Sequence, residues 1–173
     1  MNRLKGILVW LSSIGHCRGF GIQSPTDYWM VRYVINERWP YYQYDNIGRS
    51  DDWLTQKVGR LCFRLANWRQ PKTAISTDYP DYINAGCRRC QMTTDSAVVE
   101  MEMAVVTTEK ELERLLPKCG DESVLVIDRL YENRQLWKRL TEEPEATVMF
   151  DLYYCGIVLF NKKRTKKHYT INF

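Results

Sequence analysis

The chain has 173 residues, of which 45% are hydrophobic and 27% are charged. This length and balance predict one domain that buries its own core, and they exclude a low-complexity or disordered chain. No run of 18 or more apolar residues occurs, so the sequence offers no candidate for a membrane-spanning helix. The mean hydropathy of −0.45 agrees with this.

The apolar stretch over residues 6–11 follows two basic residues and therefore resembles the opening of a secretory signal. Ser12 and Ser13 cut this stretch short, and no small-residue cleavage pattern follows cleanly. We therefore expect the protein to stay in the cytoplasm.

The net charge of +4 is unevenly distributed along the chain. Residues 1–72 carry 11 Lys and Arg against 5 Asp and Glu, residues 73–160 carry 9 against 16, and residues 161–173 carry 5 against none. The basic run 162–168 is a candidate site for an anionic partner, but no aromatic residues interleave with its lysines as they do in nucleic-acid platforms. We favour a solvated loop that faces the acidic middle of the same molecule.

Residues 1–72 are predicted to form a helical lead-in. A serine N-cap followed by proline begins a helix over residues 24–38. Over residues 52–68, apolar side chains recur at spacings of four, three, one and three residues, which predicts a long helix with one apolar stripe. Leu61 and Leu65 lie on that stripe, and we expect them to face a sheet.

Residues 73–173 alternate strand and helix patterns, which predicts an α/β core with a mostly parallel sheet. Thr108 and Glu111 have the spacing of a capping box. Two apolar strands joined by a tight turn predict an antiparallel pair that closes the sheet. We expect the lead-in and this core to form a single domain. The expected strands are 73–77, 97–107, 123–128, 147–153, 156–160 and 169–173, and the expected helices are 108–117 and 132–140.

The six cysteines are scattered through predicted helices and strands, which is typical of buried free thiols. Cys87 and Cys90 alone have CxxC spacing, which suits half a zinc site or a thiol-exchange pair. Zinc needs four ligands, and the chain has two histidines, His16 and His168, and no second CxxC. We predict free thiols and no metal, with a redox or metal role as the alternative.

Several segments together resemble a known family, and the last of them is the most specific. They are Phe20–Pro25, Pro40–Tyr44, Gly59–Asn67, Pro71–Thr73, Asp121–Asp128 and the ending Phe150–Phe173. In their order and spacing they are similar to the small O-methyltransferase-like proteins of Bacteroidetes-type bacteria, within the class I S-adenosylmethionine-dependent methyltransferases. The resemblance implies a Rossmann-like sheet of seven strands, six parallel and one antiparallel, with S-adenosylmethionine at the carboxyl ends of the first strands.

The chain departs from this family in the loop after the first strand. Working members carry an acid and two or three glycines there, whereas residues 76–80 have no glycine, and none follows before Gly86. Tyr79 and Pro80 would occupy space that the cofactor needs. Only 18 residues, 78–95, separate the first strand from the next, so at least one strand of the family and its helices are missing. We therefore expect a reduced methyltransferase-like sheet.

If the cofactor pocket survives, the resemblance assigns its lining to Ser76, Asp78, Glu100 and Asp128. Glu100 has the spacing of a ribose-binding carboxylate, and an exposed strand-end glutamate is the simpler interpretation. The magnesium-dependent branch of the superfamily carries acids after the fourth and fifth strands, where this chain has Thr107 and Asp128 followed by Arg129. Because the arginine would neutralise the remaining acid, we expect no metal-assisted methyl transfer.

We therefore expect a noncatalytic remnant of the methyltransferase fold that acts as a binding or interaction module, with no catalytic residues and no cofactor. Its partner would be another protein or a second copy of the chain, and neither nucleic acid nor a membrane. One alternative is an active methyltransferase that binds S-adenosylmethionine through an atypical loop, and another is a nucleic-acid-binding protein that uses the basic run. In a closed pocket, Tyr79 or Tyr82 fills the cofactor volume and Asp128 pairs with Arg129 or faces solvent.

Overall fold

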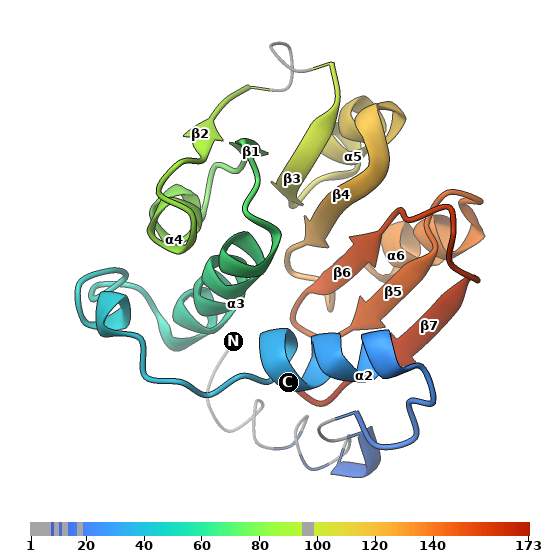
Figure 1. The fold of residues 1–173 in the computed structure, drawn as a ribbon, viewed down its shortest axis with the longest axis horizontal. Coiled ribbons are helices and arrows are strands. Elements are labelled where there is room, and N and C mark those ends of the chain that lie inside the picture. The colour runs from blue at the N-terminus through green and yellow to red at the C-terminus, as the bar shows by residue number, and fades with distance from the viewer. Residues whose placement is uncertain (1–7, 9–10, 12–13, 17–18, 95–98) are drawn as a thin grey trace.

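The computed structural model describes residues 8, 11, 14–16, 19–94 and 99–173. In these residues a seven-stranded mixed sheet has helices on both faces (Figure 1). The strands are β1 (Thr73–Ile75), β2 (Gln91–Met92), β3 (Met101–Val106), β4 (Cys119–Ile127), β5 (Val148–Asp151), β6 (Gly156–Leu159) and β7 (Lys167–Thr170). Their order is β2-β1-β3-β4-β6-β5-β7. Strand β6 runs antiparallel to both neighbours, and the other six strands share one direction. The predicted mostly parallel α/β sheet with an antiparallel strand pair is confirmed, whereas the expected loss of at least one of seven strands is wrong, because the described residues form seven.

The helices of the described residues are α2 (Pro25–Met30), the π-helical turn η2 (Val31–Ile35), α3 (Trp53–Arg69), α4 (Pro80–Gly86), α5 (Glu109–Leu115) and α6 (Arg134–Glu142), with short 3-10 turns η1 (Ile14–His16), η3 (Tyr42–Asp45) and η5 (Leu116–Lys118). Of the described α-helices, α2, α3 and α5 begin at side-chain caps, whereas α4 and α6 have none. Asp52 caps α3 because its Oδ1 accepts from the backbone N of Leu54 at 2.7 Å. Thr108 and Glu111 form the predicted capping box. Among the helices that the structure describes, none is long and apolar enough to cross a bilayer.

Two apolar layers cover the two faces of the sheet. The face that carries Val126 packs against α2, η2, α3 and α4, whereas Leu125 and Ile127 pack with α5 and α6 on the opposite face. Figure 1 shows α2 and α3 in front of the sheet and α5 and α6 behind it. Leu61 and Leu65 of α3 are fully buried in the first layer, as predicted. The lead-in thus shares one core with the sheet.

Helices α3 and α4 approach each other closely at Gly59. A Cβ at Gly59 would lie 2.5 Å from a ring carbon of Tyr82, so a larger residue does not fit there. The hydroxyl of Tyr82 donates to Asp51 Oδ2 at 2.9 Å and ties α4 to the start of α3. This contact fixes the position of the segment that follows β1.

Two strands lie elsewhere than the sequence indicates. The two-residue β2, which the sequence did not indicate, pairs with one side of β1, and β3 pairs with the other. The expected strand 97–107 is β3, which begins only at Met101 because Val99 and Glu100 form a bend, and residues 97–98 lie outside the described part. The last strand begins at Lys167 and pairs with β5, whereas residues 169–173 were expected. Strands β2 and β7 are short edge strands, and edge strands often carry polar residues that hide the apolar alternation.

The basic run 162–168 is anchored to the rest of the fold. Arg164 forms an ion pair with Asp27, which is 1% exposed and also accepts from the hydroxyl of Tyr169 at 2.9 Å. Lys162 Nζ lies 3.5 Å from Glu145 Oε1, so this end of the run does face the acidic middle of the chain. The interpretation as a solvated loop is correct only for its exposed part, because the run also supplies a buried ion pair and the start of β7.

Candidate functional site

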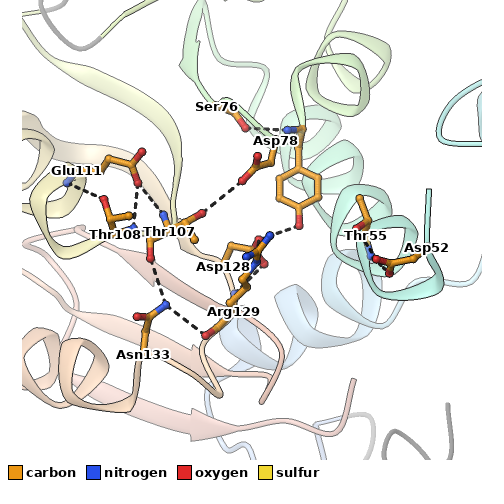
Figure 2. A network of polar contacts seen from close by, with 11 residues as sticks. Asp52, Thr55, Ser76, Asp78, Thr107, Thr108, Glu111, Asp128, Arg129 and Asn133 are labelled. Atoms are coloured by element: carbon orange, nitrogen blue, oxygen red, sulfur yellow. Dashed lines mark hydrogen bonds and ion pairs between the residues drawn. The ribbon is translucent and has the colours of Figure 1, made fainter. Parts of the chain in front are cut away.

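The carboxyl ends of β1, β3 and β4 meet where the order of the sheet changes direction. From β1 the chain continues to β2 on one side, and the next strand, β3, lies on the other side of β1. Ligands of open α/β sheets bind in the crevice outside such a switch point. The structure brings Ser76 and Asp78 after β1, Thr107 after β3 and Asp128 after β4 to this edge (Figure 2).

The side chain of Tyr79 occupies the middle of this switch-point site. Its backbone N donates to Ser76 Oγ at 3.1 Å, which turns the chain away from β1, and Pro80 then begins α4. Its hydroxyl donates to Asp128 Oδ2 at 2.9 Å, and the residue is 4% exposed. The ring therefore spans from the end of β1 to the end of β4, as the sequence led us to expect for Tyr79. The ring of Tyr82 packs edge-on against that of Tyr79, with centroids 6.3 Å apart, and against Gly59.

Asp128 is a buried carboxylate whose hydrogen bonds come from its neighbours. It is 4% exposed, and its Oδ1 accepts from the backbone N of Arg129 at 2.8 Å. Burial raises its pKa, and the bonds from Arg129 and Tyr79 oppose that rise. The Arg129 Nε lies 3.9 Å from Asp128 Oδ2, so the expected pairing of these two residues is confirmed. Burial and the adjacent Asp128 raise the pKa of Tyr79, which keeps its hydroxyl protonated as a donor.

Further polar contacts join the three loops around the site (Figure 2). Asp78 is exposed, and its Oδ2 accepts from Thr107 Oγ1 at 3.4 Å. The carbonyl of Thr107 accepts from Asn133 Nδ2 at 3.2 Å, which ties β3 to the start of α6. The backbone N of Thr107 donates to Glu111 Oε2 at 2.9 Å. Sequence analysis did not identify Asn133, because its role depends on the neighbouring strand ends rather than on any local pattern.

Glu100 does not belong to this group, and its placement as a ribose-binding carboxylate is corrected. It precedes Met101, the first residue of β3, and therefore lies at the amino end of that strand. Its side chain contacts the backbone of Gly120 near the start of β4. Because β3 and β4 are parallel, this is the edge of the sheet opposite Asp128. The simpler interpretation, an exposed glutamate at a strand end, agrees with this position.

Two residues near the carboxyl edge of the sheet have a left-handed backbone. Arg129 follows β4 with φ of 47°, and Tyr153 follows β5 with φ of 68°. Residues other than glycine adopt this conformation at an energetic cost, and such strain concentrates at functional sites and tight turns. Tyr153 stacks on Tyr131 with ring centroids 6.0 Å apart. Both left-handed residues therefore lie at the edge of the sheet that carries the switch-point site.

The cysteines give no reactive centre in the described residues. Five of them are free thiols, as predicted, and Cys17 lies outside the described part. Burial raises the pKa of Cys90 to about 11 and that of Cys119 to about 12, so both stay as unreactive thiols at neutral pH. Within the described ranges no group of three or more His, Cys, Asp and Glu side chains is placed to hold a metal ion.

Asp128 and Tyr79 are both buried and hydrogen-bonded to each other. The comparisons add no assignment: no family model matches the chain, and neither curated proteins nor solved structures gave a significant match. The function of the protein therefore has to be inferred from its own residues.

Proposed function

We propose that the protein is a noncatalytic binding module built on a reduced methyltransferase sheet that no longer binds S-adenosylmethionine. The observation that carries this proposal is the buried ring of Tyr79, bonded through its hydroxyl to Asp128 across the switch point. A ligand in this crevice would have to displace the ring and leave the buried Asp128 without one of its donors. Buried polar groups that lose a partner cost about 1–3 kcal/mol each.

The arrangement of the sheet supports the methyltransferase ancestry. The described residues give six strands in one direction and one reversed strand, which is the arrangement that the sequence resemblance implies. The elements between β1 and β3 are short, since they are one seven-residue helix and a two-residue strand, so the reduction concerns the length of this unit and not the number of strands.

The backbone after β1 supports the loss of the cofactor. A cofactor loop approaches its ligand with glycine backbone and free N–H donors, and residues 76–80 contain no glycine. The N–H of Tyr79 is already bonded to Ser76, and Pro80 has no N–H. These two positions therefore offer no backbone donor to an anionic or ribose group.

Exposed aromatic side chains on the lead-in support a binding role. Trp29 and Tyr33 lie on one face of α2 and η2 with ring centroids 5.9 Å apart, and they are 44% and 55% exposed. Trp39, which follows this helical segment, is 72% exposed. Aromatic residues are enriched in protein interfaces, and contiguous exposed apolar surface marks contact sites. We therefore assign the partner to the protein class, either another chain or a second copy of this one.

Calorimetric titration with S-adenosylmethionine and S-adenosylhomocysteine tests this proposal. We expect no saturable heat with the wild-type protein at ligand concentrations of about 1 mM, which corresponds to a binding free energy weaker than about −4 kcal/mol. The matched pair Tyr79→Ala and Tyr42→Ala removes a buried and an exposed tyrosine ring, respectively. One-to-one binding by the wild-type protein with a Kd in the micromolar range would overturn the proposal.

A further inference from the structure

A cavity lies beside α3, apart from the switch-point site. Its volume is about 380 Å³, which is within the range of small-molecule pockets. Residues 35–38, at the end of η2, form one wall and the first three turns of α3 form the other, with Phe173 beside them. None of Ser76, Asp78, Tyr79 and Asp128 lines it. The two places can therefore be tested separately.

The lining of this α3 cavity is strongly basic. It contains Arg38, Lys57, Arg60 and Arg64 and a single acidic side chain, Glu37. The Glu37 carboxylate accepts from the hydroxyl of Tyr41 at 2.9 Å, a bond within its own segment. Four cationic groups facing one volume repel one another, so the cavity has a strong preference for an anion.

Arg64 has a structural task, which leaves the other three cations for a ligand. Its Nε donates to the carbonyl of Val34 at 2.7 Å and its Nη2 to the carbonyl of Ile35 at 2.9 Å. These bonds satisfy the carbonyl end of η2. Arg60 lies over the ring of Tyr44, with 5.0 Å from its Cζ to the ring centroid. Within the described residues, no carboxylate lies at ion-pair distance from Arg38, Lys57 or Arg60.

Lys57 is the most informative of these residues. Its Nζ lies 4.4 Å from the ring centroid of Phe173 and 5.6 Å from that of Tyr154, so the ammonium group lies against two aromatic rings. Burial, with smaller contributions from Arg64 and Arg38, lowers its pKa to about 8. A bound anion would offset the free-energy cost of burying this charge. A methionine or leucine at position 57 would fill the same space without that cost.

Asn36 supplies a second, independent observation. It lines the cavity, and its Nδ2 is buried without a hydrogen-bond partner among the described residues. Such orphaned donors are rare in folded proteins, and each calls for a missing acceptor. The lining therefore brings together three cations without carboxylate partners and a residue whose buried amide donor is unsatisfied.

We propose that the α3 cavity binds a phosphate group, carried by a small phosphomonoester or present as inorganic phosphate, through Lys57 and Arg60. A phosphate dianion suits this lining better than a single carboxylate because the net positive charge of the lining is greater than one. Arginine presents paired N–H donors to phosphate oxygens, and lysine adds a compact charge. Trp53 also lines the cavity and offers an aromatic ring to the rest of the ligand. This inference goes beyond the proposed function and does not depend on whether S-adenosylmethionine binds.

Titration of the wild-type protein with inorganic phosphate and with adenosine monophosphate, at low ionic strength and pH 7.5, tests this inference. We expect saturable one-to-one binding, with adenosine as the uncharged probe showing none. Tighter binding of adenosine monophosphate would assign the site to an organic phosphomonoester, and equal affinity would assign it to free phosphate.

Charge-removing variants locate the site. Lys57→Met and Arg60→Gln should each weaken the binding at least tenfold, while the matched variant Lys110→Met, on the exposed surface of α5, should change it less than twofold. Thermal unfolding establishes that each variant is folded. The absence of saturable binding by either phosphate ligand, or an equal loss in Lys110→Met, would overturn the inference.

Discussion

Lys57 is predicted to destabilise the ligand-free protein at neutral pH. Its folded-state pKa of about 8 lies roughly 2.5 units below the ordinary value, which corresponds to about 3 kcal/mol. The contacts with Phe173 and Tyr154 oppose this penalty by about 1 kcal/mol or less each. Desolvation thus prevails, and Lys57→Met, which keeps the packing of the side-chain stem, should raise the free energy of unfolding by about 1–2 kcal/mol at pH 7.

The pH dependence of this effect follows from proton linkage. Between pH 8 and about 10.5 the unfolded lysine holds a proton that the folded one has released, so wild-type stability gains over this window relative to Lys57→Met. Urea unfolding at pH 7, 8, 9 and 10 under reducing conditions measures the difference, and Lys110→Met should differ from wild type by less than about 0.5 kcal/mol at pH 7. The reasoning would be refuted if Lys57→Met were less stable than wild type at pH 7. It would also be refuted if the difference in unfolding free energy between the two proteins were the same at every pH.

Three further changes test the packing. Leu61→Ala, in the fully buried stripe of α3, should lower the free energy of unfolding by about 2–5 kcal/mol in urea titration, and a loss below 0.5 kcal/mol would show that the stripe is exposed. Gly59→Ala should cost about 1–3 kcal/mol in the same assay because its Cβ meets the ring of Tyr82, and an unchanged midpoint would contradict that close approach. Asp27→Ala should cost about 3 kcal/mol in thermal unfolding because it leaves Arg164 without its buried partner, and a loss under 1 kcal/mol would contradict the anchoring of the basic run.

Much of the fold is predictable from local sequence patterns. The stripe that contains Leu61 predicts α3, the spacing of Thr108 and Glu111 predicts the cap of α5, and the two apolar runs near the C-terminus predict the antiparallel pair β5 and β6. These features depend on residues within one or two turns or on strand pairs close in the chain. They can therefore be read without knowledge of the tertiary structure.

Features that depend on distant residues are not predictable in this way. The two-residue strand β2 has no sequence pattern of its own and is defined only by its pairing with the edge of β1. The bond between Tyr79 and Asp128 joins residues 49 positions apart. The basic face of α3 did leave a signal, since Lys57, Arg60 and Arg64 follow at spacings of three and four. Only the fold shows that the end of η2 lies opposite this face.

A crystal structure of the protein grown with several millimolar S-adenosylhomocysteine is the most direct test of the closed switch-point site. We predict that Tyr79 stays buried with its hydroxyl within hydrogen-bond distance of Asp128, and that no ligand density appears at the carboxyl end of β1. Ligand density between the ends of β1 and β3, with the ring of Tyr79 turned away from Asp128, would contradict the account.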